Sequence, residues 1–219
     1  MDRLMTVNAS DPCMNDHRYG GRRIVSAASQ IATMTKAAPA EGHAGCLEGL
    51  SFRRPVEVHE RVQLTLRMVG DELRLSEGRD EVARSRLATA ASMQPARRPG
   101  RMAGNVTDVT EGFRSWLDDE CPMEYGPFYD VVRRLEEVES PSGRYAVARV
   151  DGGPTMPAGR RFPEAYIDAG FQVLAFVGGE GRGGLCLGSP VQSVYSRVEG
   201  VRSRTAYEST LSQQPWVLF

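Results

Sequence analysis

The chain has 219 residues, which is enough for one large domain or two small ones with a sizeable core. Its 27 basic and 28 acidic side chains leave a formal net charge of -1, which argues against a general nucleic-acid-binding protein. Four scattered cysteines, no apolar run of bilayer length and no apolar signal core indicate a reduced, cytoplasmic protein without disulfides, a cysteine zinc site or a membrane partner.

The first half of the chain predicts a loop, one helix and an antiparallel set of strands. After a short strand over 5–10, a turn-rich segment carries His17 and the glycine pair Gly20-Gly21, which permits positive φ or close backbone approach. Ser26 fits the N-cap of a helix over 27–38. Alternating apolar and polar residues predict strands over 49–58, 62–69, 72–76 and 82–91.

The second half repeats this order. Residues 93–110 are rich in Pro, Gly and Arg, which predicts a linker. The segment 121–139 fits an apolar-flanked turn that leads into either a helix or a strand, and Pro163 fits the first position of a long helix. The remaining expected elements are helices over 111–119 and 163–177 and strands over 144–150, 190–201, 205–211 and 216–219.

This doubled order of loop, helix and strands predicts an α+β fold of the double-hotdog type. Such a fold has two antiparallel sheets, each wrapped on a central helix, and we expect the two halves to share one continuous sheet. The expected domains are 1–92, the N-terminal hotdog with His17, and 111–219, the C-terminal hotdog with Asp168, separated by the linker 93–110. The halves share no sequence identity, so the repeat is one of pattern alone.

A polar pair lies along the apolar stripe of the second long helix. Ile167, Phe171 and Leu174 are spaced i, i+4, i+7, and Asp168 and Gln172 are spaced i, i+4 beside them. A carboxylate beside a buried stripe is costly unless it is paired or used. The spacing alone leaves two interpretations, a solvated Asp168 or a general acid held by the amide one turn later.

His17 is one of three histidines and lies close to the glycine turn and the start of the first helix. A neutral imidazole is a natural proton acceptor near pH 7, so His17 is either a general base or a surface-loop histidine. His43 and His59 are interpreted as structural or solvated. No HExxH motif or spaced His/Cys set is present, so we expect no metal site.

Three motifs together carry a resemblance to a known family. His17 to Gly21 fits HxxxG, Tyr125-Gly126-Pro127 fits YGP, and Asp168 to Gln172 fits DxxxQ. In this order and spacing they resemble the dehydratase domains of modular polyketide synthases, over about residues 5–199. The chain departs from the usual HxxxGxxxxP pattern at Ser26, where the family has proline, and from the usual Gly-Tyr before YGP, where it has Pro122-Met123.

The resemblance implies an enzyme that removes water from a β-hydroxyacyl chain, carried on an acyl carrier protein through a phosphopantetheine thioester. His17 would take the C2 proton, Asp168 would protonate the departing C3 hydroxyl, and Gln172 would orient the Asp168 carboxyl. The thioester carbonyl would accept from a backbone N–H near Val25. Tyr125 would either hydrogen-bond the substrate hydroxyl or line the pocket. The implied substrate-binding set is Tyr125, Gly21, Val25 and Pro127.

This chemistry needs no metal and no cofactor. The implied partners are the carrier protein and the polyketide synthase machinery, and a homodimer is also compatible with the resemblance. Relatives of this fold also shift double bonds or close rings, so a cyclase or isomerase and a non-catalytic acyl-binding hotdog remain open as alternatives. The apolar residues flanking the motifs predict a tunnel for the pantetheine arm, lined by Met34, Tyr125, Phe128 and Phe171.

Overall fold

The structure is a computed structural model, and its described backbone comprises eight segments. They are residues 2–37, 47–87, 104–140, 143–150, 164–178, 191–199, 202–211 and 214–217. The predicted helix opener Pro163 and His43 lie outside these residues. Among the helices of the described segments, none has both the length and the apolar character needed to span a bilayer.

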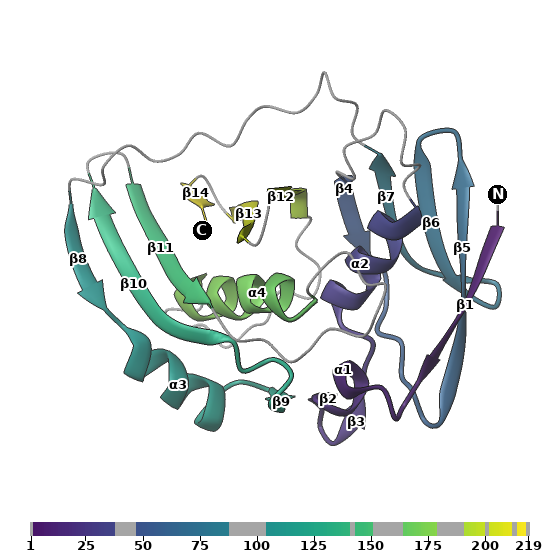
Figure 1. Cartoon of the computed structure of the whole chain (residues 1–219), viewed down its shortest axis with the longest axis horizontal. Helices are drawn as coiled ribbons and strands as arrows, with labels where there is room; N and C mark the ends of the chain where they lie inside the picture. The colour runs from purple at the N-terminus through teal and green to yellow at the C-terminus, as the bar shows by residue number, and fades with distance from the viewer. Residues whose placement is uncertain are drawn as a thin grey trace.

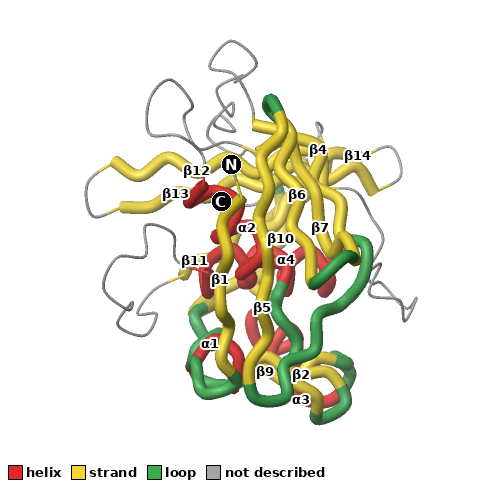
Figure 2. The backbone as a smooth tube through the Cα atoms, turned by 90° about the vertical axis from the view of Figure 1, so that its right-hand side faces the viewer, coloured by secondary structure: helices red, strands yellow, loops and turns green. Residues whose placement is uncertain are grey.

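The N-terminal half packs one helix on an antiparallel sheet (Figure 1). The strands lie side by side in the order β1-β5-β6-β7-β4, as Figure 2 shows. Their bounds are β1 (Asp2–Asn8), β4 (Leu47–Phe52), β5 (Arg61–Val69), β6 (Glu72–Glu77) and β7 (Asp80–Leu87). Helix α2 (Ala27–Ala37) contacts β6, and the small residues Ala28 and Ala32 are fully buried on it. Small side chains let a helix lie close to the sheet.

The C-terminal half repeats this arrangement with its own helices and strands. Its strands are β8 (Asn105–Asp108), β10 (Val132–Ser140), β11 (Gly143–Val150), β12 (Val191–Glu199), β13 (Arg202–Leu211) and β14 (Gln214–Val217). Helix α4 (Glu164–Gly178) contacts β11 and β13, and α3 (Thr110–Asp119) contacts β10. The rings of Phe113 and Trp116 on α3 pack against Phe176 on α4, with centroids 5.5 and 5.8 Å apart.

The two halves are joined through the main sheet and through the two long helices. Strand β4 pairs with β12, so strands of both halves form one eight-stranded sheet, and α2 contacts α4. All pairings between described strands are antiparallel. The expected continuity therefore holds for these eight strands, whereas β11-β10-β8 form a separate sheet whose strand β11 contacts β14.

One detail of the fold contradicts the sequence-based expectation, and a second decides between two alternatives that the sequence left open. Strand β8 falls inside the expected linker 93–110 and pairs with β10, so the linker interpretation is wrong for residues 105–108. All four residues of β8 are exposed, and for this reason no apolar alternation marks the strand in the sequence. In the segment 121–139, the expected turn leads into a strand, β10, and not into a helix.

A third, small sheet connects segments that are far apart in the chain. It consists of β2 (His17–Tyr19), β3 (Arg22–Arg23) and β9 (Met123–Tyr125), in the order β3-β2-β9. The short helix α1 (Pro12–Asn15) leads into β2. This sheet brings the HxxxG and YGP motifs into register, with His17 opposite Tyr125.

Candidate active site

His17 lies at the start of β2 and is buried, with 6% of its surface exposed. The turn after β2 has Gly20 and Gly21 at φ +55° and +74°, a left-handed conformation that favours glycine. The His17 ring makes edge contacts with Tyr125 and Tyr129, at centroid distances of 5.6 and 5.4 Å. The surface-loop interpretation of His17 is therefore wrong, because two aromatic rings enclose the imidazole.

One hydrogen bond fixes the tautomer of this imidazole. Nδ1 of His17 lies 3.1 Å from the carbonyl oxygen of Ile24. A carbonyl only accepts, so in the neutral ring Nδ1 carries the proton and Nε2 holds a free lone pair. Nε2 is the nitrogen that faces Asp168. The local fold thus presents a proton acceptor toward the second half of the chain.

Asp168 lies on α4 and is 3% exposed, so the solvated interpretation is wrong. Gln172, one turn later, donates from Nε2 to Oδ2 of Asp168 at 3.0 Å, which leaves Oδ1 as the oxygen nearer to His17. Burial raises the pKa of the Asp168 carboxyl above its ordinary value, although His17 and the Gln172 hydrogen bond act in the opposite direction. A carboxyl with a raised pKa is suited to donate a proton.

His17 and Asp168 meet although 151 positions separate them in the chain. Nε2 of His17 and Oδ1 of Asp168 are 3.7 Å apart. At this distance the two atoms are too far apart for a direct hydrogen bond, so both are free to bond a third molecule. An imidazole and a carboxyl group from the two halves thus lie side by side, and the packing of the halves sets the distance between them.

The YGP turn is hydrogen-bonded to Asp16, the residue just before His17. The main-chain N–H of Gly126 donates to the Asp16 carbonyl at 2.9 Å, and the N–H of Phe128 donates to Asp16 Oδ2 at 2.7 Å. A Cβ at Gly126 would overlap the Asp16 carboxyl group, so this close approach requires glycine. Pro127 is exposed on the turn, where its ring restricts the backbone.

Tyr125 is half-buried beside His17, and burial raises the pKa of its phenol well above the ordinary value. The phenol therefore stays protonated and acts as a hydrogen-bond donor. Among the described residues its hydroxyl has no hydrogen-bond partner. Tyr125 is thus placed to donate to a bound molecule next to the imidazole.

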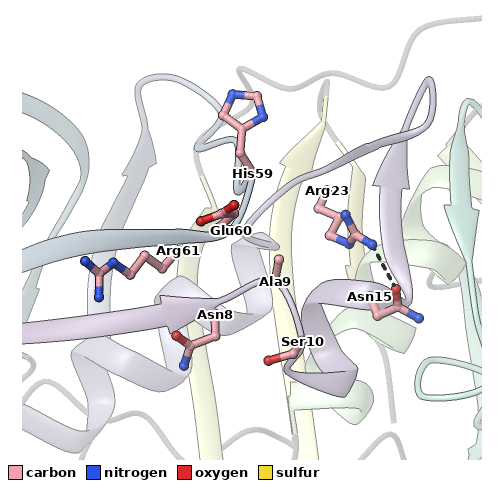
Figure 3. A pocket seen from close by; sticks show the side chains of 8 residues that line it. All are labelled: Asn8, Ala9, Ser10, Asn15, Arg23, His59, Glu60 and Arg61. Carbon is pink, nitrogen blue, oxygen red and sulfur yellow. Dashed lines mark hydrogen bonds between the residues drawn. The ribbon is translucent and has the colours of Figure 1, made fainter.

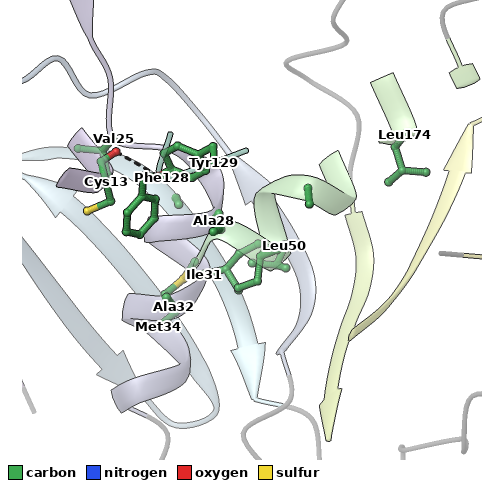
Figure 4. Packing of buried hydrophobic residues seen from close by; sticks show 14 of the residues in the cluster. Cys13, Val25, Ala28, Ile31, Ala32, Met34, Leu50, Phe128, Tyr129 and Leu174 are labelled. Atoms are coloured by element: carbon green, nitrogen blue, oxygen red, sulfur yellow. Dashed lines mark hydrogen bonds between the residues drawn. The ribbon is translucent and has the colours of Figure 1, made fainter. Parts of the chain in front are cut away.

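Tyr129 is a central residue that the sequence interpretation missed. It is 1% exposed, and its hydroxyl donates to the Cys13 carbonyl at 3.1 Å (Figure 4). Its main-chain carbonyl accepts from Gln172 at 3.5 Å, and its ring contacts that of Phe128 at a centroid distance of 4.9 Å. The only sequence signal was its place two residues after YGP, in the segment YGPFY.

The structure does not favour the expected roles of Gly21 and Val25. The Gly21 N–H is exposed and donates to Glu124 Oε1 at 2.7 Å, and the Val25 N–H donates to the Val56 carbonyl at 2.9 Å. Both donors are therefore already used in holding the small sheet and the start of α2. The next N–H groups along the chain are those of Ala27 and Ala28, in the first turn of α2. N–H groups in the first turn of a helix have no carbonyl acceptor within the helix.

The residues expected to line a tunnel are buried or half-buried. Met34 and Phe128 are 0% and 4% exposed, and Phe171 is half-buried. Phe128 is linked to His17 through the Tyr129 ring. The tunnel itself stays a prediction.

A separate groove of about 450 Å³ lies outside the dyad (Figure 3). Its lining includes Asn15, Arg23, Glu60 and Arg61, together with His59, whose side chain is 85% exposed. Within the described residues no group of His, Cys, Asp and Glu side chains could hold a metal ion. In the part of the chain that the structure describes, neither Cys13 nor Cys121 forms a disulfide.

Comparison with known proteins gives similarity at the level of structure. No protein-family model and no curated protein matches the chain. An N-terminal dehydratase from the difficidin assembly line aligns with a TM-score of 0.65 at 13% identity, covering 98% of this chain and 84% of that one. The dehydratase domain from the terminal module of the rifamycin polyketide synthase aligns with a TM-score of 0.65 at 16% identity, covering 97% and 82%.

An inactive Asp-to-Asn variant of CurK dehydratase aligns with a TM-score of 0.66 at 13% identity, covering 97% of this chain and 83% of that one. An inactive His-to-Phe variant of the same dehydratase is also similar. These alignments span nearly the whole chain and show that it has the double-hotdog fold of polyketide synthase dehydratase domains.

Proposed function

We propose that this protein is a dehydratase that eliminates water from a β-hydroxyacyl chain carried on the phosphopantetheine arm of an acyl carrier protein. The observation that carries the proposal is the buried pair of His17 Nε2 and Asp168 Oδ1 at 3.7 Å, with Gln172 bonded to the other carboxylate oxygen. An acyl-binding protein without catalysis has no need of a base, a carboxyl group with a raised pKa and an orienting amide in one place.

The proposed first event is proton abstraction by His17. The proton at C2 of a β-hydroxyacyl thioester is acidified by the thioester carbonyl, and Nε2 of His17 takes it. The Ile24 carbonyl supports this step because it holds the proton on Nδ1 and stabilises the imidazolium that forms. Negative charge then develops on the thioester oxygen. The N–H groups of Ala27 and Ala28 at the start of α2 are the proposed donors to that oxygen, in place of the Val25 N–H.

The proposed second event is protonation of the leaving group by Asp168. The C3–O bond breaks as Oδ1 of Asp168 gives its proton to the hydroxyl, which departs as water while the C2=C3 double bond forms. Gln172 donates to Oδ2, and this directs the acidic proton to Oδ1. The raised pKa of Asp168 supports its role as the acid. The imidazolium proton returns to the carboxylate to restore the starting state.

Two further observations support the assignment. CurK dehydratase, whose structure is similar, is inactive when a histidine or an aspartate is replaced, as expected for His/Asp chemistry. Tyr125 has a protonated hydroxyl beside His17, which suits a donor to the substrate hydroxyl or carbonyl.

The test is mass spectrometry of a carrier protein loaded with a 3-hydroxyacyl chain after incubation with the protein. Dehydration removes the mass of one water from the loaded carrier. An unchanged mass with altered retention indicates isomerisation or ring closure instead. No change with any 3-hydroxyacyl carrier, while the acyl chain still binds, contradicts an enzymatic function.

A further inference from the structure

Helix α4 carries a second buried carboxylate in line with Asp168. Glu164, Asp168 and Gln172 are spaced four residues apart and so lie along one face of the helix. Their exposed fractions are 4%, 3% and 2%. Burying a carboxylate is costly unless hydrogen bonds compensate it. Glu164 therefore needs a structural or functional reason for its position one turn before the acid.

Glu164 is bonded to the start of the other central helix. Ser29 donates from Oγ to Oε2 of Glu164 at 3.1 Å, and Ser26 donates from Oγ to Oγ of Ser29 at 3.0 Å. Ser26 also caps α2, because its Oγ accepts from the Ser29 N–H at 3.0 Å. Ser26 and Ser29 are 1% and 7% exposed. The N-terminal ends of α2 and α4, one from each half, are thus tied together by buried hydrogen bonds to a carboxylate.

This tie continues to the residues around the dyad. Ser26 Oγ lies 3.3 Å from the Tyr129 hydroxyl. The Tyr129 carbonyl accepts from Gln172, and Gln172 holds Asp168. The contacts therefore form a closed ring that leaves α4 at Gln172 and returns to it at Glu164. His17 packs its imidazole edge against the Tyr129 ring of the same network.

We propose that Glu164, Ser29 and Ser26 form a positioning set that holds α4 against α2 and thereby keeps Asp168 within reach of His17. The set acts through Asp168 and takes no part in proton transfer. Because the base and the acid come from different halves, the distance between them depends on how α2 and α4 pack. A misplacement of about 1 Å at an active site costs up to about 100-fold in rate.

Ser26 lies at the position where the family resemblance predicts a proline. A proline at this position could not make the hydrogen bonds that Ser26 contributes to the set. A proline has no hydroxyl, so it could neither donate to Ser29 Oγ nor accept from the Ser29 N–H. In this chain the set therefore depends on the serine at position 26.

The first test compares two substitutions of Glu164. Glu164→Gln keeps the size and an oxygen that accepts from Ser29, whereas Glu164→Leu keeps only the approximate size. The kinetic measurement rests on the proposed function. The kcat of the Glu164→Leu variant is expected to fall about 10- to 100-fold, with KM within about threefold of the wild-type value. The glutamine variant is expected to stay within about threefold of the wild-type kcat, because its amide restores the bond.

Ser29→Ala removes only the hydroxyl that joins the two helices, and its effect should not add to that of Glu164→Leu in a double-mutant cycle. Thr35→Ala is the matched control, because Thr35 lies on α2 but donates only to the Ile31 carbonyl of the same helix at 2.8 Å. Glu111→Gln is the control for replacing a first-turn glutamate, because Glu111 lies in the first turn of α3, as Glu164 does in α4, but is exposed. Both controls are expected to keep the wild-type kcat and KM.

Crystal structures of the variants give a measurement that needs no turnover. The distance from His17 Nε2 to Asp168 Oδ1 is expected to widen from 3.7 Å in Glu164→Leu and Ser29→Ala, and to stay near that value in Glu164→Gln. A folded leucine variant with the wild-type kcat, or with an unchanged distance, overturns the proposal. If the leucine variant fails to fold, Ser29→Ala decides by the same two measurements. If the wild-type protein dehydrates nothing, the proposed function fails while the distances still decide this inference.

Discussion

Replacing Asp168 by Asn separates the chemistry of the site from its shape. The asparagine Oδ1 can accept from Gln172, and its Nδ2 can donate toward Nε2 of His17, so the buried neighbours keep hydrogen-bond partners. The variant is therefore expected to fold like the wild type. What it loses is the proton that the proposed mechanism delivers to the departing hydroxyl.

The expected loss follows from the burial of this position. A general acid typically contributes between about 100-fold and about 10,000-fold to the rate, or about 2.7 to 5.4 kcal/mol of transition-state free energy. Asp168 is 3% exposed, so bulk water has little access to replace the missing acid. We therefore expect a fall in kcat of at least about 100-fold, with little change in KM, because the substrate-binding groups remain in place.

Whereas kcat should fall in the Asp168→Asn variant, its free energy of unfolding should stay the same or rise. Because the folded protein raises the pKa of Asp168 above 3.8, the folded state binds this proton more tightly than the unfolded state. The free energy of unfolding therefore falls as pH rises from the unfolded pKa to the folded pKa, and stays lower above it. Asparagine does not titrate, so at pH 7 the Asp168→Asn variant is expected to be at least as stable as the wild type.

The assay is turnover of a 3-hydroxyacyl carrier protein followed by mass spectrometry, with urea unfolding monitored by circular dichroism at pH 5 and pH 7. Thr35→Ala serves again as the control for a helix substitution away from the dyad. A variant that retains near wild-type kcat shows that Asp168 is not the acid. A variant that is destabilised more at pH 7 than at pH 5 contradicts the proposed burial effect.

The remaining predictions concern the base, the tyrosine network and the pH dependence. His17→Ala is expected to lower kcat at least about 100-fold in the same assay, and a folded variant with wild-type turnover refutes its role as the base. Tyr129→Phe leaves the Cys13 carbonyl without its hydroxyl donor and is expected to cost about 1 to 3 kcal/mol in urea unfolding; an unchanged unfolding midpoint would show that this bond adds no stability. Gly126→Ala forces a methyl group into the Asp16 carboxyl and is expected to cost about 1 to 3 kcal/mol, which the same experiment measures against Gly112→Ala, where a new Cβ meets only a Phe176 ring atom at 3.8 Å. Wild-type kcat should fall as pH rises through the raised pKa of Asp168, since only the protonated form is an acid, and a kcat that instead rises over that range excludes this role.

The sequence predicted most of the elements because their signals are local. The helix over 27–38 appears as α2 (Ala27–Ala37), and Ser26 caps it as expected. The alternation over 62–69 and 72–76 corresponds to β5 and β6, which place their apolar residues in the core. Strand β8 was missed because all of its side chains face solvent, so that only its pairing with β10 defines it.

The motif spacing named His17, Asp168 and Gln172, but it could not decide whether the first two were buried or solvated. That depended on tertiary contacts: Tyr125 and Tyr129 enclose the imidazole, and the packing of the two halves buries the carboxyl. The expected donors Gly21 and Val25 proved to be occupied for the same reason. Their partners, Glu124 and the Val56 carbonyl, lie 103 and 31 positions away in the chain.

By itself, the sequence determined which segments form helices and strands and which residue types are able to exchange protons. It did so because helical and strand periodicity and side-chain chemistry are properties of short segments. The tertiary structure alone decided that a histidine on β2 and a carboxylate on α4 lie 3.7 Å apart, that Tyr129 joins their surroundings, and that Glu164 connects α4 to Ser29 on α2. These relations depend on packing between the two halves, which brings together residues more than one hundred positions apart and so leaves no trace in local sequence patterns.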